Sequence, residues 1–201
     1  MIKTIIFDIG GVVTHTDFKA IYSGFARRIG IAPEVVIEYH KTHLSDLLLG
    51  NITIERFWQD MRDAGGDPAL NFEEIWVDEG SKHREINDGL LALIEKLRKN
   101  YSVGTLTNLT ASRLLIDEKM DIYLHFDYTV LSCVEHLKKP DPAFYRIALA
   151  RADAQPDEAI FIDDREEPVA IAVQMGIKGI LYRYPENDAL VRELKASGVE
   201  I

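Results

Sequence analysis

The chain has 201 residues, of which 47% are hydrophobic and 28% are charged, and its formal net charge is −10. These values are typical of one globular unit with or without an insertion, and the acidic charge argues against nucleic acid and anionic membranes as partners. The single cysteine, Cys133, excludes an intrachain disulfide, which is typical of a reducing compartment. Because no membrane-length apolar run or signal-peptide pattern is present, we expect a cytoplasmic protein without a membrane partner.

Short runs rich in β-branched and aromatic residues predict the strands of one sheet. These runs are Lys3–Asp8, Ser102–Thr107, Tyr128–Ser132, Ala159–Asp163 and Gly179–Tyr182. Helical segments or compact connections separate the later runs, which is the pattern of a parallel sheet. Pro142 predicts the first turn of one connecting helix, and Gly176 predicts the end of another. The predicted fold class is α/β, with a Rossmann-like parallel sheet of about five core strands flanked by helices.

The interval between the first two predicted strands is far longer than one crossover helix needs. Apolar residues at helical spacing predict helices over 18–29, from Pro33, after the N-cap Thr53, and near 72–79. No strand pattern interrupts them. We therefore predict an all-helical cap over residues 16–85, inserted after the first strand, and a Rossmann-like core formed by residues 1–15 and 86–201.

Polar residues stand where three of the predicted strands end. Asp8 ends the first strand, Thr107-Asn108 end the second, and Asp163-Asp164 end the fourth, while Lys139 follows the third. Ligands of open parallel sheets bind outside the carboxyl ends of the strands. Each residue alone is ordinary turn, cap or surface chemistry. Together, at equivalent ends of strands in one sheet, they predict a single site.

These residue types suit phosphoryl transfer. A carboxylate such as Asp8 can attack phosphorus and form an aspartyl-phosphate, which divides one difficult displacement into two easier ones. Mg²⁺ is commonly held by one or two carboxylates and a phosphate oxygen. Lys139 would add a second positive charge, Thr107 a hydroxyl donor, and the small residues after Asp8 would leave backbone N–H groups open to an anion.

The motifs FDIGG, TLTN, KKPDPAFY and FIDD, in this order, resemble the four motifs of the haloacid dehalogenase superfamily of hydrolases. The resemblance covers nearly the whole chain and implies Asp8 as the nucleophile and Asp164 as a metal ligand, with Asp163 as its neighbour. In full, it implies Asp8 and Lys139 as catalytic residues, Gly11, Thr107, Asn108 and Lys139 as phosphate-binding residues, and Asp8, Gly10 and Asp164 as ligands of Mg²⁺. The predicted cap resembles the one that the family places between its first two motifs.

Position 10 departs from the usual family pattern. Most phosphatases of the family carry a second aspartate there as general acid and base, and Gly10 can do neither. General acid–base assistance contributes about 10²–10⁴ in rate. The chain thus resembles the Asp-x-Gly phosphatases of the glucose-1-phosphatase type, and we expect a preference for good leaving groups. His15 and Asp17 are the nearby residues that could replace the missing acid if the chain folds back over the site.

The function predicted from these observations is that of a Mg²⁺-dependent phosphatase acting on a small phosphorylated metabolite through an aspartyl-phosphate, with a sugar 1-phosphate as one candidate. The protein would be a monomer or a homodimer. Two alternatives stay open: a 2-haloacid dehalogenase, in which Asp8 attacks carbon, and a catalytically weak protein that binds phosphate ligands. The dehalogenase is less favoured because the acidic pair would be idle and the dehalogenase tyrosine is missing at position 10.

Overall fold

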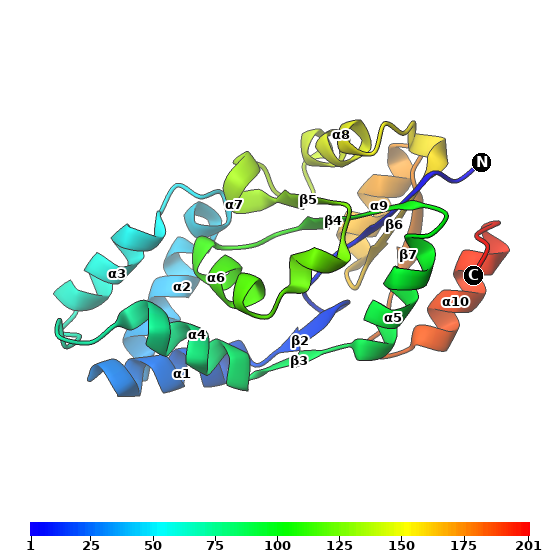
Figure 1. Cartoon of the computed structure of the whole chain (residues 1–201). Coiled ribbons are helices and arrows are strands. Elements are labelled where there is room, and N and C mark those ends of the chain that lie inside the picture. Colours follow the sequence, from blue (N-terminus) through cyan, green and yellow to red (C-terminus); the bar gives the residue numbers. More distant parts are fainter.

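The computed structural model describes residues 1–201 and contains a parallel sheet between two layers of helices (Figure 1). The strands are β1 (Thr4–Phe7), β4 (Ser102–Thr107), β5 (Tyr128–Leu131), β6 (Ala159–Asp163) and β7 (Lys178–Leu181). Their order is β5-β4-β1-β6-β7, and every neighbouring pair is parallel. The predicted strands are confirmed to within one residue at each end. The Rossmann-like α/β fold class is confirmed with them.

Alternation along the strands divides the core between the two faces of the sheet. Ile5 and Phe7 of β1 pack beneath one helical layer, while Ile6 packs beneath the other. The first layer contains α5 (Asp88–Leu97), η1 (Ile122–His125) and α10 (Asn187–Ala196), and the second contains α8 (Pro142–Arg151) and α9 (Glu166–Gln174). As predicted, Pro142 begins α8, and Gly176 follows α9 with a positive φ of 87°. No helix is both long and apolar enough to cross a lipid bilayer.

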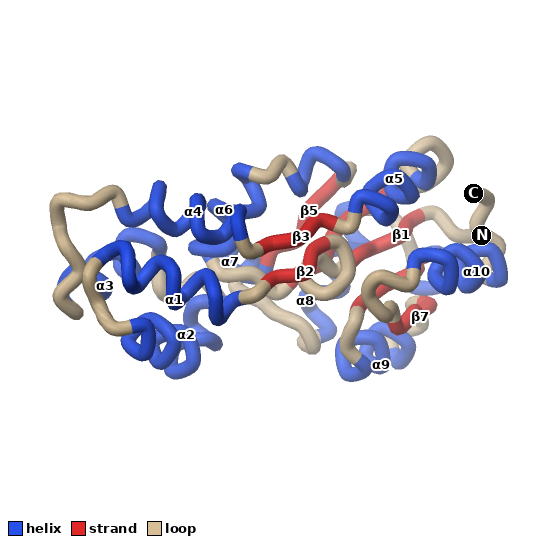
Figure 2. Tube along the Cα trace, turned by 90° about the horizontal axis from the view of Figure 1, so that it is seen from below, coloured by secondary structure: helices blue, strands red, loops and turns tan.

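Four helices form an insertion after the first strand, and two short strands frame it. The helices are α1 (Phe18–Ile29), α2 (Pro33–Leu48), α3 (Ile54–Asp63) and α4 (Phe72–Lys82). They lie between β2 (Thr14–Thr16) and β3 (Arg84–Ile86), which pair antiparallel. The sequence did not predict these strands, because three residues are too few to show an alternating pattern. Figure 2 shows the insertion helices at one end of the molecule and both termini at the other.

The helical insertion packs on α6 (Ala111–Lys119), the helix that follows β4. Its own core is rich in aromatic side chains from α1, α3 and α4, and Ile116 of α6 belongs to the same apolar cluster. The indole Nε1 of Trp76 donates a 2.7 Å hydrogen bond to the carbonyl oxygen of Ser112. At the other side, the backbone of Leu49 accepts a hydrogen bond from His136, and Lys138 donates to Ser45. These contacts hold the insertion over the carboxyl ends of β1 and β4.

Candidate active site

A cavity of about 390 Å³ opens at the carboxyl ends of β1, β4 and β6. Six residues predicted for the site line it: Asp8, Gly10, Gly11, Thr107, Asn108 and Asp164. The insertion contributes Phe18, Leu44 and Leu48 to the opposite wall. The cavity is therefore built jointly by the strand ends of the sheet and by the helical insertion. Lys139, the remaining predicted residue, lies buried behind Asp8.

Lys139 connects two carboxylates beneath the cavity. Its Nζ lies 2.9 Å from Oδ1 of Asp8 and 2.6 Å from Oδ2 of Asp163. The side chains of Lys139 and Asp163 have no exposed surface, and that of Asp8 has 7%. Removing such charges from water is costly unless they are paired, and the ion pair with Lys139 fixes the carboxylate of Asp8 at the floor of the cavity.

Asn108 fixes the segment that carries Lys139. Its amide Nδ2 donates to the carbonyl oxygen of Lys139 at 3.0 Å, and its Oδ1 accepts from the backbone N–H of Lys139 at 2.8 Å. Both ends of the side-chain amide are thus engaged. The part of Asn108 that can reach a ligand is its backbone N–H, which donates to no protein acceptor. The side chain of Asn108 serves to position Lys139.

Gly11 provides space for Asp164. A Cβ at position 11 would overlap the carboxylate of Asp164, and the positive φ of 78° also favours glycine here. The backbone N–H of Gly11 donates to the carbonyl oxygen of Thr14, so it is not open to an anion. The open N–H groups of this loop belong to Ile9 and Gly10. The sequence predicted open backbone N–H groups after Asp8, and the structure places them at the first and second residues after it.

Several hydrogen-bond donors at the strand ends face the cavity without a protein acceptor. The N–H groups of Ile9, Gly10 and Asn108 donate to no protein acceptor, and Thr107 lines the cavity beside them. Successive backbone N–H groups of this kind bind phosphate in many proteins. These N–H groups are therefore available to an anion in the cavity.

The three aspartates of the site fit a divalent cation. Carboxylate oxygens of Asp8, Asp163 and Asp164 lie within 4.8 Å of one another, and Oδ1 of Asp8 has the ion pair with Lys139 but no hydrogen bond of good geometry. Hard oxygen donors of this kind suit Mg²⁺. Asp163 already accepts from Lys139 through Oδ2 and from the N–H of Arg165 through Oδ1. Asp8 and Asp164 are therefore the carboxylates available to a metal.

The carboxyl group of Asp164 has a raised pKa. Burial raises the pKa of its carboxyl group to about 6, and the nearby negative charges of Asp8 and Asp163 act in the same direction. A cation between Asp8 and Asp164 would remove this repulsion. The shift thus agrees with a site whose charge is balanced only when a metal is bound.

Arg113 is a site residue that the sequence did not indicate. It is in the first turn of α6, after Ser112, and it lines the cavity with its guanidinium 4.5 Å above the ring of Phe18. Of the two residues considered as replacements for the missing acid, His15 lines the cavity and stacks on Tyr184. Asp17 does not, because its carboxylate caps α1 by accepting from the N–H of Ala20. A lone arginine has no motif that would have identified it.

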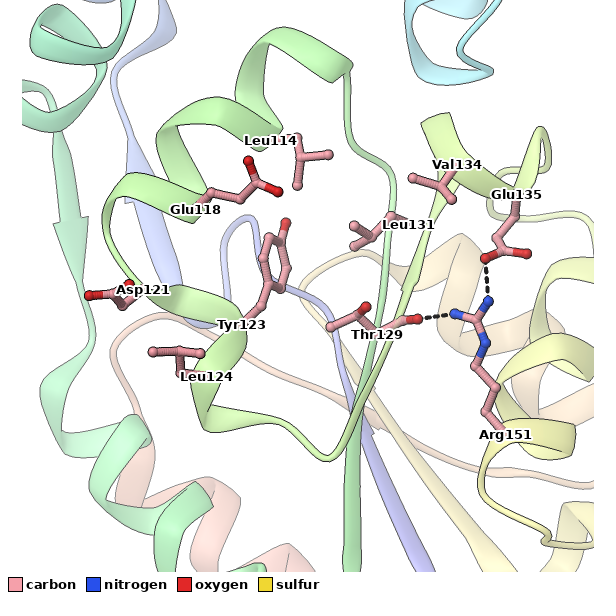
Figure 3. A pocket seen from close by; sticks show the side chains of 10 residues that line it. All are labelled: Leu114, Glu118, Asp121, Tyr123, Leu124, Thr129, Leu131, Val134, Glu135 and Arg151. Atoms are coloured by element: carbon pink, nitrogen blue, oxygen red, sulfur yellow. Dashed lines mark hydrogen bonds and ion pairs between the residues drawn. The ribbon is translucent and has the colours of Figure 1, made fainter.

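A second cavity, of about 510 Å³, lies beside the edge strand β5 (Figure 3). Leu124 and Tyr123 of η1 form one side, and Arg151 on the other side bonds to the backbone of Thr129 and to Glu135. None of the motif residues lines this cavity. The chemistry predicted from the sequence therefore belongs to the first cavity.

The chain is similar to several known proteins. The chain is 27% identical over 201 residues to D-ribitol-5-phosphate phosphatase of Bacteroides thetaiotaomicron, a match that covers 94% of each chain. It is 29% identical over 116 residues to flavin mononucleotide hydrolase 1 of Arabidopsis thaliana, covering 57% of this chain and 46% of that protein. The chain spans less than half the length of this relative and of the mammalian bifunctional epoxide hydrolase 2 that it also matches.

A solved structure shares the fold. It is a HAD family enzyme of Bacteroides thetaiotaomicron in complex with magnesium and inorganic phosphate, with a TM-score of 0.77 at 23% identity, covering 95% of this chain and 99% of that one. The family model for haloacid dehalogenase-like hydrolases matches residues 2–176, which include every motif residue of the site. The chain therefore belongs to the haloacid dehalogenase-like hydrolases.

Proposed function

We propose that the protein is a Mg²⁺-dependent phosphatase that hydrolyses a small phosphorylated metabolite through an aspartyl-phosphate on Asp8. The observation that carries the proposal is the position of Asp8. Its carboxylate lies on the cavity floor, paired with Lys139, beneath open backbone N–H groups and beside a second carboxylate that is free for a metal.

The proposed reaction has two steps, in which the residues of the cavity take part. An oxygen of Asp8 bonds to phosphorus while the ester bond to the substrate oxygen breaks. Water then attacks the phosphorus while the bond to Asp8 breaks, which releases inorganic phosphate and restores the carboxylate. The N–H groups of Ile9, Gly10 and Asn108, with Thr107, hold the phosphoryl oxygens during both steps. Asp8, Asp164 and the carbonyl oxygen of Gly10 would hold Mg²⁺, which supplies charge neutralisation at the phosphoryl group.

The comparisons support phosphate esters over other substrates. One relative that matches along nearly its whole length is named for a polyol phosphate, and a structure of the same fold holds magnesium and inorganic phosphate. We therefore favour a sugar or polyol phosphate, among which a sugar 1-phosphate stays a candidate. We further propose that residues 16–85 act as the cap over the substrate, since Phe18, Leu44 and Leu48 form the wall that faces the sheet.

The decisive experiment measures phosphate release from a panel of sugar, polyol, nucleotide and aryl phosphates, with Mg²⁺ and with EDTA. Wild type is expected to be active only with Mg²⁺. Asp8→Asn should lower kcat by at least about 10³-fold, because only binding and electrostatic terms then remain. The matched control is Asp157→Asn, an exposed change far from the cavity, which should leave kcat unchanged.

Other outcomes would replace the proposal. Release of halide from 2-haloacids in EDTA, without phosphate release, would identify a dehalogenase. Binding of inorganic phosphate by calorimetry with no turnover of any ester would identify a binding protein. Full activity of a folded Asp8→Asn protein would exclude the aspartyl-phosphate.

A further inference from the structure

Arg113 occupies the space left open by the missing side chain at position 10. Its Nη2 lies 3.2 Å from the point where a Cβ of residue 10 would stand. Its guanidinium lies 4.5 Å above the ring centre of Phe18 in the helical insertion. The N-cap Thr110 and the bond from Trp76 to the carbonyl of Ser112 fix the start of α6, from which Arg113 extends. Arg113 is therefore held between the sheet and the insertion, and its guanidinium lies beside Gly10, the second residue after Asp8.

The charge of Arg113 has no partner within the protein. Its side chain makes no ion pair and donates no hydrogen bond to a protein acceptor, and its Nε is shielded from solvent without a partner. The other cations of the site differ, since Lys139 pairs with Asp8 and Asp163, and Arg165 lies 3.7 Å from Asp163. In a chain of net charge −10, a half-buried cation without a carboxylate indicates that a ligand supplies the negative charge.

The geometry of in-line displacement at phosphorus indicates which oxygen of the substrate Arg113 contacts. The attacking and leaving oxygens lie roughly in line through phosphorus, so the ester oxygen faces away from Asp8. The open backbone N–H groups and Lys139 lie on the sheet side, at the nucleophile. Arg113 and Phe18 lie toward the insertion, where the leaving alcohol must extend.

We propose that Arg113 is a catalytic residue that stabilises the leaving group: its guanidinium donates hydrogen bonds to the ester oxygen as negative charge develops there. This inference rests on the proposed phosphatase function and deepens it. As Asp8 bonds to phosphorus, the ester P–O bond breaks and its electron pair passes to the alcohol oxygen. Arg113 keeps its protons, because a guanidinium group stays charged in proteins, and the alkoxide takes its proton from water. Phosphate esters of ordinary alcohols thereby become substrates despite Gly10.

The test is a leaving-group series. The value of kcat/KM is measured with Mg²⁺ for aryl and alkyl phosphates of graded alcohol pKa, on wild type, Arg113→Gln and Arg113→Lys. Arg113→Gln should lower kcat/KM for alkyl phosphates by about 10²–10³-fold, the scale for one lost donor to a developing oxyanion. For nitrophenyl phosphate, whose leaving group needs little help, the loss should stay below about tenfold. The slope of log kcat/KM against alcohol pKa should steepen, and Arg113→Lys should restore part of it.

A matched control is Lys119→Gln, which removes one positive charge from the exposed last turn of the same helix. It should leave the slope unchanged, and thermal melts should show that all variants are folded. An equal loss for every ester would overturn the inference, because Arg113 would then act on the non-bridging oxygens or on the fold. A loss confined to esters with a second anionic group would overturn it in favour of distal recognition.

The two proposals fail in different ways. If wild type hydrolyses the esters and Arg113→Gln shows the same slope, the leaving-group role is excluded and the phosphatase function stands. If wild type hydrolyses none of the esters with Mg²⁺, both proposals are excluded.

Discussion

Arg84 and Asp117 form an ion pair in which neither side chain has any exposed surface. The pair joins β3, at the end of the helical insertion, to α6, the helix that carries Arg113. Arg84 also donates a 2.9 Å hydrogen bond to Oγ1 of Thr14, and Tyr123 donates a 2.7 Å hydrogen bond to Asp117. Burial lowers the pKa of Arg84, against the opposing effect of Asp117. Both strands that frame the insertion are therefore fixed to the catalytic core through one charged network.

Breaking this ion pair should be costly. Asp117→Asn leaves the buried guanidinium of Arg84 without a counter-charge, and we expect a loss of about 3–5 kcal/mol in the free energy of unfolding. The double variant Arg84→Met with Asp117→Leu should lose less than the single one, because no unpaired charge remains. Urea denaturation measures all three proteins. Asp78→Asn, at an exposed ion pair, is the control and should have little effect. A single variant as stable as this control would contradict the argument.

Gly11→Ala should cost more than the left-handed conformation alone explains. The matched control is Gly30→Ala, where φ is 86° and nothing stands within 4 Å of a Cβ. Both changes should cost about 1–2 kcal/mol for the backbone conformation. Gly11→Ala should additionally displace Asp164 and weaken Mg²⁺ binding, which Gly30→Ala should not. Calorimetric titration with Mg²⁺ distinguishes the two, and equal metal affinity in both variants would be inconsistent with the packing of Asp164 on Gly11.

Mg²⁺ binding should depend on pH near 6. The pKa of Asp164 is raised to about 6, so a proton competes with the metal below that pH. Between pH 7 and pH 5 the ionised fraction falls about tenfold, and the apparent Mg²⁺ affinity should fall by a similar factor. Without metal, the folded state binds this proton more tightly than the unfolded chain does, whose ordinary pKa is 3.8. Stability from this group should therefore fall as pH rises from about 4 through 6.

Added Mg²⁺ should reverse that loss, because the metal favours the ionised form. Thermal melts across pH 4–8, with and without Mg²⁺, measure both effects. In Asp164→Asn the stabilisation by Mg²⁺ should be small at every pH. Strong stabilisation of this variant by the metal would show that Asp163, not Asp164, supplies the second carboxylate.

His40 should make the protein sensitive to acid. Its ring stacks on Tyr22, with the ring centres 4.2 Å apart, and also lies parallel to the ring of Trp76 at 5.5 Å. Burial lowers the pKa of His40 from 6.5 to about 4. Between these pH values the unfolded chain binds more protons than the folded state, so stability falls as pH decreases through 6.5 to 4. The full loss is about 3 kcal/mol. Asp164 contributes the opposite slope in the same pH range, so the comparison is made in the Asp164→Asn background, where denaturation curves at several pH values should be flatter with His40→Phe than with His40. His83→Gln, an exposed histidine, should keep the wild-type pH dependence.

The sheet could be predicted from sequence because its strands are buried on both faces and appear as continuous apolar runs. Strands β2 and β3 could not, because Thr14–Thr16 and Arg84–Ile86 pair only when the insertion brings distant segments together. The four motif positions could be predicted as one site because parallel strands place their carboxyl ends at one edge.

The contacts within the site could not be predicted in the same way. Adjacent residues Asp163 and Asp164 are equivalent in sequence, and only the structure shows that Lys139 engages the first. Arg113 follows an ordinary N-cap residue. Its guanidinium can lie close to Gly10, about a hundred positions earlier in the chain, because glycine has no side chain. A pattern search examines the residues that a family retains. It does not detect Arg113, which belongs to another part of the chain and lies beside Gly10 only in the folded protein.

The pairing of β2 with β3 has a consequence for how this protein can vary. Thr16 lies opposite Arg84, so the helical insertion leaves and re-enters the core at neighbouring points. A different insertion could therefore join the core at these two points while Asp8 and the sheet stay in place. A replacement would have to cover Ile116 and satisfy the carbonyl of Ser112, which now contact Trp76 and its neighbours. Substrate range could then diversify by recombination at two adjacent joints while the reaction chemistry is inherited intact.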